Sequence, residues 1–155
     1  MPLFNPPQLF IDACVLVAAA HSPTGGSAYA LELCRRGWAS ALVTQLVLQE
    51  AERNIRVKLG QADLLRFYRL LSDIDFIMEP PVTQQEIALY THLIAAKDAH
   101  VLAAAVRSKA DYLLTLDTKH FMTEALLQAN LGPIIVTPGQ FLSRYLEEHN
   151  SEEST

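Results

Sequence analysis

The sequence predicts a three-layer α/β/α domain with a central, mainly parallel sheet of about five short strands. Five apolar segments of strand length recur along the chain, and patterns of helical periodicity lie between them. No Asn-Gly dipeptide occurs, so the strongest short-range signal of a β-hairpin is missing. Strands that alternate with helices pair in parallel within one sheet, because the helical crossover returns the chain to the starting edge.

Periodicity, capping residues and turn residues set the bounds of the expected elements. Asp98 opens one helix, whose apolar stripe follows at helical spacing. The expected strands are 8–12, 39–44, 75–78, 112–116 and 134–136, and the expected helices are 15–20, 28–36, 45–59, 62–71, 83–96, 98–106, 119–130 and 139–148.

The chain of 155 residues has the length of one domain, and half of its residues are apolar. Pro residues are frequent in segment 1–7, which is an N-terminal lead-in. Residues 8–149 form the single expected domain, since no repeat, low-complexity tract or linker interrupts them. Segment 150–155 is polar and acidic, so we expect a disordered tail there.

Charge and apolar runs narrow the functional classes. The net charge is −5 and the pI is about 5.5, so no overall basic field indicates nucleic-acid binding. The apolar run Cys14–Ala20 is far shorter than the roughly 20 residues that span a membrane. No basic leader precedes it, and Cys14 and Cys34 match no metal or redox spacing. We therefore expect a cytoplasmic protein with reduced thiols and no membrane partner.

The acidic residues separate into two groups by their position relative to the strands. Asp12 and Asp117 lie where strands end, whereas Asp75 and Asp111 lie where strands begin. Ligands of parallel α/β sheets bind outside the carboxyl ends of the strands. The first pair therefore belongs to the expected site, and the second pair belongs to the opposite edge.

Two further acids belong to the same carboxyl edge. Glu50 lies early in the helix that leaves the second strand, and Asp98 opens the helix that leads into the fourth strand. Two of the four acids also have an ordinary structural interpretation when taken alone: Asp98 suits a helix N-cap, and Asp117 suits a turn. Taken together, four carboxylates are expected to converge: Asp12, Glu50, Asp98 and Asp117.

Converging carboxylates require either protons or a cation, because like charges repel. A pair separated by about 4 Å costs roughly 4 kcal/mol at an effective dielectric constant of 20. Oxygen-only ligands without Cys or His favour Mg²⁺ or Mn²⁺ over Zn²⁺. Such ions promote phosphodiester hydrolysis, because they activate water and stabilise the attacking and leaving oxygens.

Four short motifs, in this order and at suitable spacing, resemble those of the PIN domain family. The first strand of that family commonly ends in Asp-Thr-Asn-Val-Leu, and Ile11–Leu16 stands in its place. The family's helical Glu matches the end of Thr44–Glu50, and its Lys-Asp pair matches Lys97–Asp98. Its Ala-Asp-x-Leu-x-Thr-x-Asp motif matches Ala110–Asp117, and the resemblance extends over about residues 8–142.

The resemblance implies an endoribonuclease that uses Mg²⁺ or Mn²⁺ to cut single-stranded RNA, leaving a 5′-phosphate and a 3′-hydroxyl. It assigns metal binding to Asp12, Asp98 and Asp117. Glu50 would hold a second ion or its water, and Thr115 would orient a carboxylate or water through its hydroxyl.

Many PIN domains are toxins of toxin–antitoxin pairs, so the resemblance also implies protein partners. An antitoxin would place a basic residue among the carboxylates, and the two amphipathic helices within 46–72 offer it a surface. A second copy of the chain is another implied partner, since PIN domains often form homodimers.

One departure from the family pattern supports an alternative function. Cys14 stands where Asn is usual, and Ala13 replaces a hydroxyl residue. A thiol is a weaker hydrogen-bond partner than an amide, so Asp12 would be held more loosely. The alternative is a degenerate PIN domain that acts as a protein-binding module with little or no nuclease activity.

Three basic residues are candidates for substrate binding. Arg53 and Arg56 lie one helical turn apart and would contact the RNA backbone, although a solvated helix face explains them equally well. His120 follows Asp117 by three residues and would contact a phosphate.

Two other α/β classes with acidic pockets fit less well. A phospho-accepting receiver domain needs paired acids after its first strand, where this chain has Asp12 alone. A haloacid-dehalogenase-like phosphatase needs Asp-x-Asp, and position 14 is Cys.

Overall fold

The structure, a computed structural model, describes residues 5–153, with side chains as far as residue 150. Residues 1–4 of the expected lead-in and residues 154–155 of the expected tail lie outside the described residues. The last helix, α9 (Pro138–Glu153), continues beyond its expected end at residue 148. The domain bounds stay predictions.

Five strands form one sheet in the order β3-β2-β1-β4-β5, and every neighbouring pair is parallel. This confirms the expected parallel α/β fold. The strands are β1 (Gln8–Ile11), β2 (Ser40–Thr44), β3 (Ile77–Glu79), β4 (Tyr112–Leu114) and β5 (Ile134–Val136).

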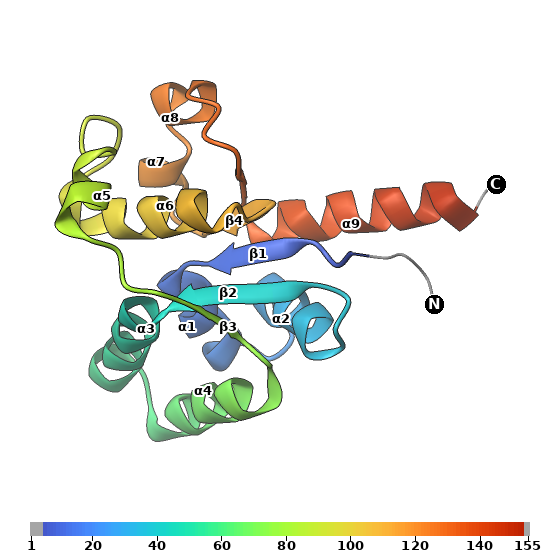
Figure 1. Ribbon diagram of the computed structural model, residues 1–155. Helices are drawn as coiled ribbons and strands as arrows, with labels where there is room; N and C mark the ends of the chain where they lie inside the picture. The colour runs from blue at the N-terminus through green and yellow to red at the C-terminus, as the bar shows by residue number, and fades with distance from the viewer. Residues whose placement is uncertain (1–4, 154–155) are drawn as a thin grey trace.

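Helices cover both faces of the sheet, which completes the three layers (Figure 1). One group of helices lies above the sheet in that view, a second group lies below it, and α9 extends to the right. The upper group is α5 (Gln84–Ala88), α6 (Ala96–Ser108), α7 (Thr118–Phe121) and α8 (Glu124–Gln128), and the lower group is α1 (Ala13–His21), α2 (Gly26–Arg35), α3 (Gln45–Lys58) and α4 (Gln61–Asp73).

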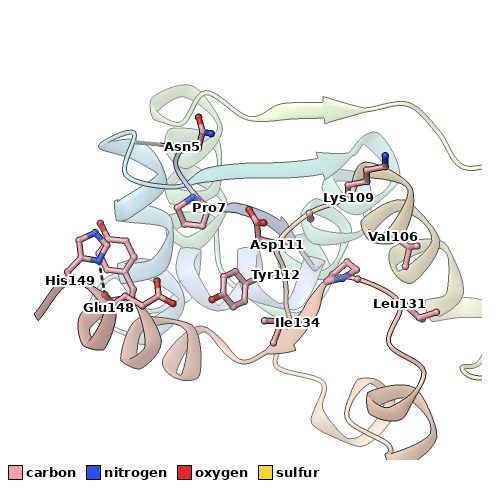
Figure 2. A pocket seen from close by; sticks show the side chains of 14 residues that line it. Asn5, Pro7, Val106, Lys109, Asp111, Tyr112, Leu131, Ile134, Glu148 and His149 are labelled. Atoms are coloured by element: carbon pink, nitrogen blue, oxygen red, sulfur yellow. Dashed lines mark hydrogen bonds between the residues drawn. The ribbon is translucent and has the colours of Figure 1, made fainter. Parts of the chain in front are cut away.

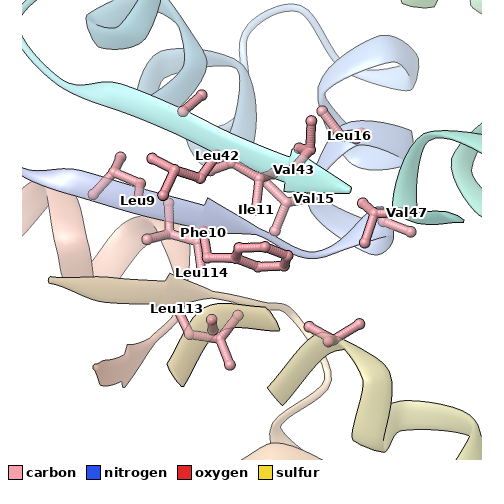
Figure 3. Packing of buried hydrophobic residues seen from close by; sticks show 14 of the residues in the cluster. Leu9, Phe10, Ile11, Val15, Leu16, Leu42, Val43, Val47, Leu113 and Leu114 are labelled. Carbon is pink, nitrogen blue, oxygen red and sulfur yellow. The ribbon is translucent and has the colours of Figure 1, made fainter. Parts of the chain in front are cut away.

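The central strand β1 is buried on both faces. Leu9, Phe10 and Ile11 are fully buried, and side chains of β2, β4, α1 and α3 surround them (Figure 3). A strand with helices over both faces has no solvent side, so its residues are continuously apolar instead of alternating. Burial of β1 therefore fixes the position of its carboxyl end, where the chain becomes polar at Asp12.

Two expected helices are wrong, because each is interrupted by a turn. Segment 83–96 forms α5 only as far as Ala88, and a turn leads from there to α6. The Thr91 hydroxyl donates a hydrogen bond to the Ala88 carbonyl, which competes with continued helix formation. Segment 119–130 divides into α7 and α8, because Thr123 caps a new helix by accepting a bond from the Leu126 amide.

Four strands differ from their expected bounds: β1 ends at Ile11 instead of residue 12, β2 begins at Ser40 instead of residue 39, and β3 and β4 differ by two residues at one end. β3 lies at Ile77–Glu79 instead of 75–78, and β4 ends at Leu114 instead of residue 116. The register pairs Ile11 of β1 with Leu114 of β4, and the Asp12 amide donates to the Leu114 carbonyl at 3.0 Å. This pairing brings together the residue that follows β1, Asp12, and the residue that follows β4, Thr115, at the carboxyl edge of the sheet.

Candidate metal centre

Asp12 leaves β1 at the carboxyl edge and caps helix α1. Its Oδ1 accepts a hydrogen bond from the Ala13 amide at 2.8 Å. Its Oδ2 accepts from the Thr115 hydroxyl at 2.8 Å. The side chain is buried. Its orientation is fixed by these two donors, one of which follows β1 and the other β4.

Thr115 connects two of the predicted site acids. Its fully buried hydroxyl donates to Asp12 Oδ2 and accepts a bond from the Asp117 amide at 3.1 Å. A hydroxyl can donate one hydrogen bond while accepting others, which an apolar side chain of the same shape cannot do. The loop after β4 is thereby held against the end of β1.

Cys14 takes part in the same network. Its Sγ lies 3.4 Å from Asp12 Oδ2 and accepts a bond from the Leu116 amide at 3.3 Å. Burial and the neighbouring Asp12 charge raise the pKa of the thiol to about 11. The thiol therefore stays protonated at neutral pH and donates to Asp12 at the position where the family pattern has Asn.

Asp98 lies in the first turn of α6. The N-cap is Ala95, so the interpretation of Asp98 as an N-cap is wrong. Its Oδ2 is buried and has no hydrogen-bond partner among the residues that the structure describes. Lys97 Nζ lies 3.2 Å from this oxygen, without the alignment of a hydrogen bond, and the lysine side chain is largely exposed. A buried carboxylate oxygen without a donor is costly unless a cation or water satisfies it.

Asp98, Asp117 and His120 converge on one point. Each offers one possible ligand atom, and these atoms lie within 4.8 Å of one another. His120 Nδ1 lies 2.9 Å from Asp117 Oδ1 and 2.8 Å from its Oδ2. Two carboxylates and an imidazole at this spacing, with one oxygen left without a donor, fit a divalent cation.

Sequence reasoning expected oxygen ligands alone and assigned His120 to phosphate binding. The sequence did contain a signal that His120 lies close to Asp117. The two residues are three positions apart, and this spacing places both side chains on one face when a helical turn forms. This turn forms as α7, and Asp117 is its N-cap.

Asp12 lies outside this group of three, although it is electrostatically coupled to it. Burial raises the pKa of Asp12 above its ordinary value of 3.8, and the Asp98 charge adds to the increase. Hydrogen bonds from Thr115, Cys14 and the Ala13 amide act in the opposite direction. The coupling indicates that negative charge is concentrated around Asp12 and Asp98.

Glu50 reaches the same edge by a different contact. Its Oε1 lies 2.9 Å from Nε2 of His100, a buried residue of α6 two positions after Asp98. The Glu50 side chain is 40% exposed and is not part of the group formed by Asp98, Asp117 and His120. The sequence placed His100 near this edge, where an isolated histidine is usually a surface or packing residue; its position two residues after Asp98 was the available signal for a role in the site.

The two arginines of α3 differ in their contacts. Arg56 donates to Glu52 at 3.0 Å and to the Tyr68 hydroxyl at 2.7 Å. Arg53 is exposed, has no hydrogen bond or ion pair within the described part of the chain, and lines a shallow hollow of about 380 Å³ together with Glu50. Arg53 is therefore the freer of the two candidates for contact with a substrate.

A larger hollow, of about 610 Å³, lies at the opposite edge of the sheet (Figure 2). Asp111 and Tyr112 line it at the start of β4, and Ile134 lines it at the start of β5. Asp111 accepts a hydrogen bond from the Gln8 amide at 2.8 Å and is exposed. The edge predicted for Asp111 is confirmed, and this hollow is not part of the metal centre.

Comparison with known proteins identifies the family. The model of the PIN domain matches residues 8–119, so the chain belongs to the PIN domain family. This confirms the resemblance drawn from the four sequence motifs. No curated protein matches the chain.

Solved structures with the same fold are much less similar in sequence. PAE2754 from Pyrobaculum aerophilum has 19% identity and a TM-score of 0.59, over 89% of this chain and 94% of that one. VapBC2 from Rickettsia felis, solved bound to a DNA fragment from its promoter, has 16% identity and a TM-score of 0.58, over 84% and 98%. FitAB, solved bound to the IR36 DNA fragment, has 15% identity and a TM-score of 0.53, over 84% and 94%.

Among the helices of residues 5–153, none combines the length and the apolar character that a membrane span requires.

Proposed function

We propose that this protein is a metal-dependent PIN endoribonuclease that hydrolyses phosphodiester bonds in single-stranded RNA. The observation that carries the proposal is the buried Asp98 Oδ2, which has no hydrogen-bond donor within the described chain and is grouped with Asp117 and His120. The group lies at the carboxyl edge of a parallel sheet, where ligands of such sheets bind. Membership of the PIN family supports nucleic-acid hydrolysis as the reaction.

Asp98 and Asp117 hold the cation, which is Mg²⁺ or Mn²⁺. When bound, such an ion promotes the ionisation of water and stabilises negative charge on the phosphodiester oxygens. Asp12 adds negative charge that strengthens cation binding. Thr115 fixes the orientation of Asp12 through its hydrogen bond of 2.8 Å. The same hydroxyl accepts from the Asp117 amide, so one side chain orients two acids.

Glu50 binds a second ion or orients a water molecule at the edge of the centre. Its Oε1 lies 2.9 Å from His100 Nε2. This contact orients the carboxylate, and Oε2 is the oxygen that would bind the ion or the water. Arg53 shares the hollow of Glu50 and contacts the RNA backbone. Arg56 also adds positive charge to this face, although Glu52 neutralises part of it.

The decisive assay measures cleavage of single-stranded RNA in Mg²⁺ and in Mn²⁺ by the wild type and two variants. Asp98→Asn removes one charge from the centre, and we expect a loss of about 10²-fold or more, the scale for removing a group that stabilises transition-state charge. Asp111→Asn removes one charge from the opposite edge and serves as the matched control, with activity near that of the wild type. Equal cutting by all three proteins would contradict the assignment.

The same assay separates the nuclease from the alternative function. A folded wild type that cuts no RNA and binds no Mn²⁺ in calorimetry would identify a degenerate PIN domain that binds proteins. This comparison is needed because the partly buried thiol of Cys14 stands next to Asp12 where the family usually has an amide.

We further propose that the protein is a cytoplasmic toxin with an antitoxin partner. The likeness of fold to VapBC2 and FitAB supports this assignment. The partner would place a basic side chain among the acids and contact the amphipathic helices within 46–72. Co-purification with the product of an adjacent gene tests the pairing, and light scattering of the isolated chain tests the proposed homodimer.

A further inference from the structure

We infer that His120 is a direct ligand of the cation, so that the centre prefers a first-row transition cation such as Mn²⁺ to Mg²⁺. The inference rests on the proposed function only in requiring that a cation binds between Asp98 and Asp117. It adds a nitrogen donor to a site for which the sequence predicted oxygen ligands alone.

The position of the imidazole is the first argument. His120 Nδ1 lies 2.8 and 2.9 Å from the two Asp117 oxygens, and a possible ligand atom of Asp98 lies within 4.8 Å of both residues' ligand atoms. Neighbouring ligands of an ion bound at about 2.1 Å are themselves about 3 Å apart when the bond angle is near 90°. The spacing between His120 and Asp117 therefore suits two adjacent ligands of one ion.

The local backbone holds His120 in this position. Asp117 caps α7, and its Oδ1 accepts a bond from the His120 amide at 3.2 Å as well as from the imidazole. The His120 side chain is 39% exposed, which leaves the centre open to an ion from solvent. On binding, the Nδ1 lone pair would face the cation in place of the hydrogen bond to Asp117.

Asp98 supplies an independent reason for a ligand at this point. Its Oδ2 is shielded from solvent and has no hydrogen-bond donor within the described chain, whereas both Asp117 oxygens already lie within hydrogen-bonding distance of His120. A structural ion pair between His120 and Asp117 would satisfy those two residues and leave Asp98 Oδ2 with only the largely exposed Lys97 ammonium, 3.2 Å away and without the alignment of a hydrogen bond. A cation bound by all three satisfies each of them.

The nitrogen donor determines which cation is preferred. Mg²⁺ takes oxygen ligands almost exclusively and keeps several of its waters. Imidazole binds first-row transition cations well, and affinity at a mixed nitrogen and oxygen site rises from Mn²⁺ towards Cu²⁺. Two carboxylates and one imidazole therefore bind Mn²⁺ more tightly than Mg²⁺, and replacing the imidazole reduces this difference.

The test uses the whole chain without a histidine tag and measures Mn²⁺ binding by electron paramagnetic resonance. Pulsed measurements detect a ¹⁴N nucleus bonded directly to Mn²⁺. We expect this coupling in the wild type and in the control His92→Ala, whose exposed histidine precedes α6, and its absence in His120→Ala. The Mn²⁺ dissociation constant of His120→Ala is expected to rise about 10- to 100-fold. The Mg²⁺ constant is expected to change much less.

A second variant keeps the test decisive if His120→Ala does not fold. His120→Asp replaces the nitrogen by an oxygen donor, so it is expected to bind Mn²⁺ without ¹⁴N coupling and to bind Mg²⁺ more tightly than the wild type. Wild-type protein with Mn²⁺ bound but no ¹⁴N coupling would overturn the inference, as would equal weakening of Mn²⁺ and Mg²⁺ in His120→Ala.

These outcomes are distinguishable from failure of the proposed function. ¹⁴N coupling in a protein that cuts no RNA would support the metal ligand and reject the ribonuclease. Unchanged Mn²⁺ binding in Asp98→Asn would place the ion elsewhere and reject both.

Discussion

The two edges of the parallel sheet both carry aspartates, and they use them differently. At the amino edge, Asp111 accepts a hydrogen bond from the Gln8 amide at 2.8 Å and joins the starts of β4 and β1. At the carboxyl edge, Asp98 has a buried oxygen without a donor in the described chain. A carboxylate that is satisfied by the backbone stabilises the fold, whereas one left without a donor is available to a ligand.

The size of a hollow is a poorer guide to the functional edge than the state of its carboxylates. The amino edge has a hollow of about 610 Å³, in which Lys109, Asp111 and Glu148 contribute charges of both signs. The carboxyl edge gathers two carboxylates and an imidazole within 4.8 Å. Convergence of like charges, which needs compensation by a cation, is the stronger indication of a chemical site.

The largest effect on stability is expected from removing the buried hydrogen bonds of Thr115 at the carboxyl edge. Thr115→Val keeps the shape of a buried side chain but removes the donor to Asp12 and the acceptor for the Asp117 amide. We expect the free energy of unfolding to fall by about 1–3 kcal/mol, the cost of leaving buried polar groups unsatisfied. Urea unfolding in the presence of a chelator measures it.

The comparison variant for that experiment is Asp111→Ala, which removes a single exposed hydrogen bond to Gln8. Its expected cost is about 0.5–1.5 kcal/mol, because water replaces the lost acceptor. A loss as large as that of Thr115→Val would show that the two edges do not differ in the way described.

A smaller effect is expected for the contact between Glu50 and His100. The imidazole is buried and the carboxylate is 40% exposed, so solvent weakens their interaction. A double-mutant cycle with Glu50→Ala and His100→Ala is expected to give a coupling energy of about 1 kcal/mol. A coupling energy indistinguishable from zero would mean that His100 does not orient Glu50.

The smallest expected effect depends on pH. Burial and the Asp98 charge raise the pKa of Asp12 in the folded protein above 3.8, so the folded state binds this proton more tightly than the unfolded state. The free energy of unfolding of the wild type therefore falls as pH rises from 3.8 through the raised pKa of Asp12. Asp12→Asn retains an N-cap side chain without the charge.

In Asp12→Asn an amide nitrogen replaces the oxygen that accepts from Thr115, which shifts the melting temperature by an amount that does not depend on pH. In the presence of a chelator, the melting temperature of the variant relative to the wild type is expected to be highest at neutral pH. It should fall as pH falls through the raised pKa and below 3.8, where Asp12 becomes protonated in both states. Thermal unfolding between about pH 4 and pH 8 measures the trend. A relative melting temperature that rises on acidification would contradict the cause assigned to the pKa increase.

Local sequence patterns determined most of the fold. Continuously apolar segments predicted buried strands such as β1, and the alternation with helices predicted their parallel pairing. The positions of Asp12 and Asp117 after strands placed them at the carboxyl edge. Two helix interruptions were missed, because Thr91 and Thr123 act through hydrogen bonds that helical periodicity does not reveal.

By itself, the sequence determined the class of fold, the family and the edge of the sheet that carries the acids, because these follow from periodicity and residue order. Only the tertiary structure decided which carboxylate oxygens are satisfied. Thr115 donates to Asp12 across 103 positions of the chain, and His100 contacts Glu50 across 50. Donors that distant are brought into place by packing of the sheet and helices, and that packing leaves Asp98 without one.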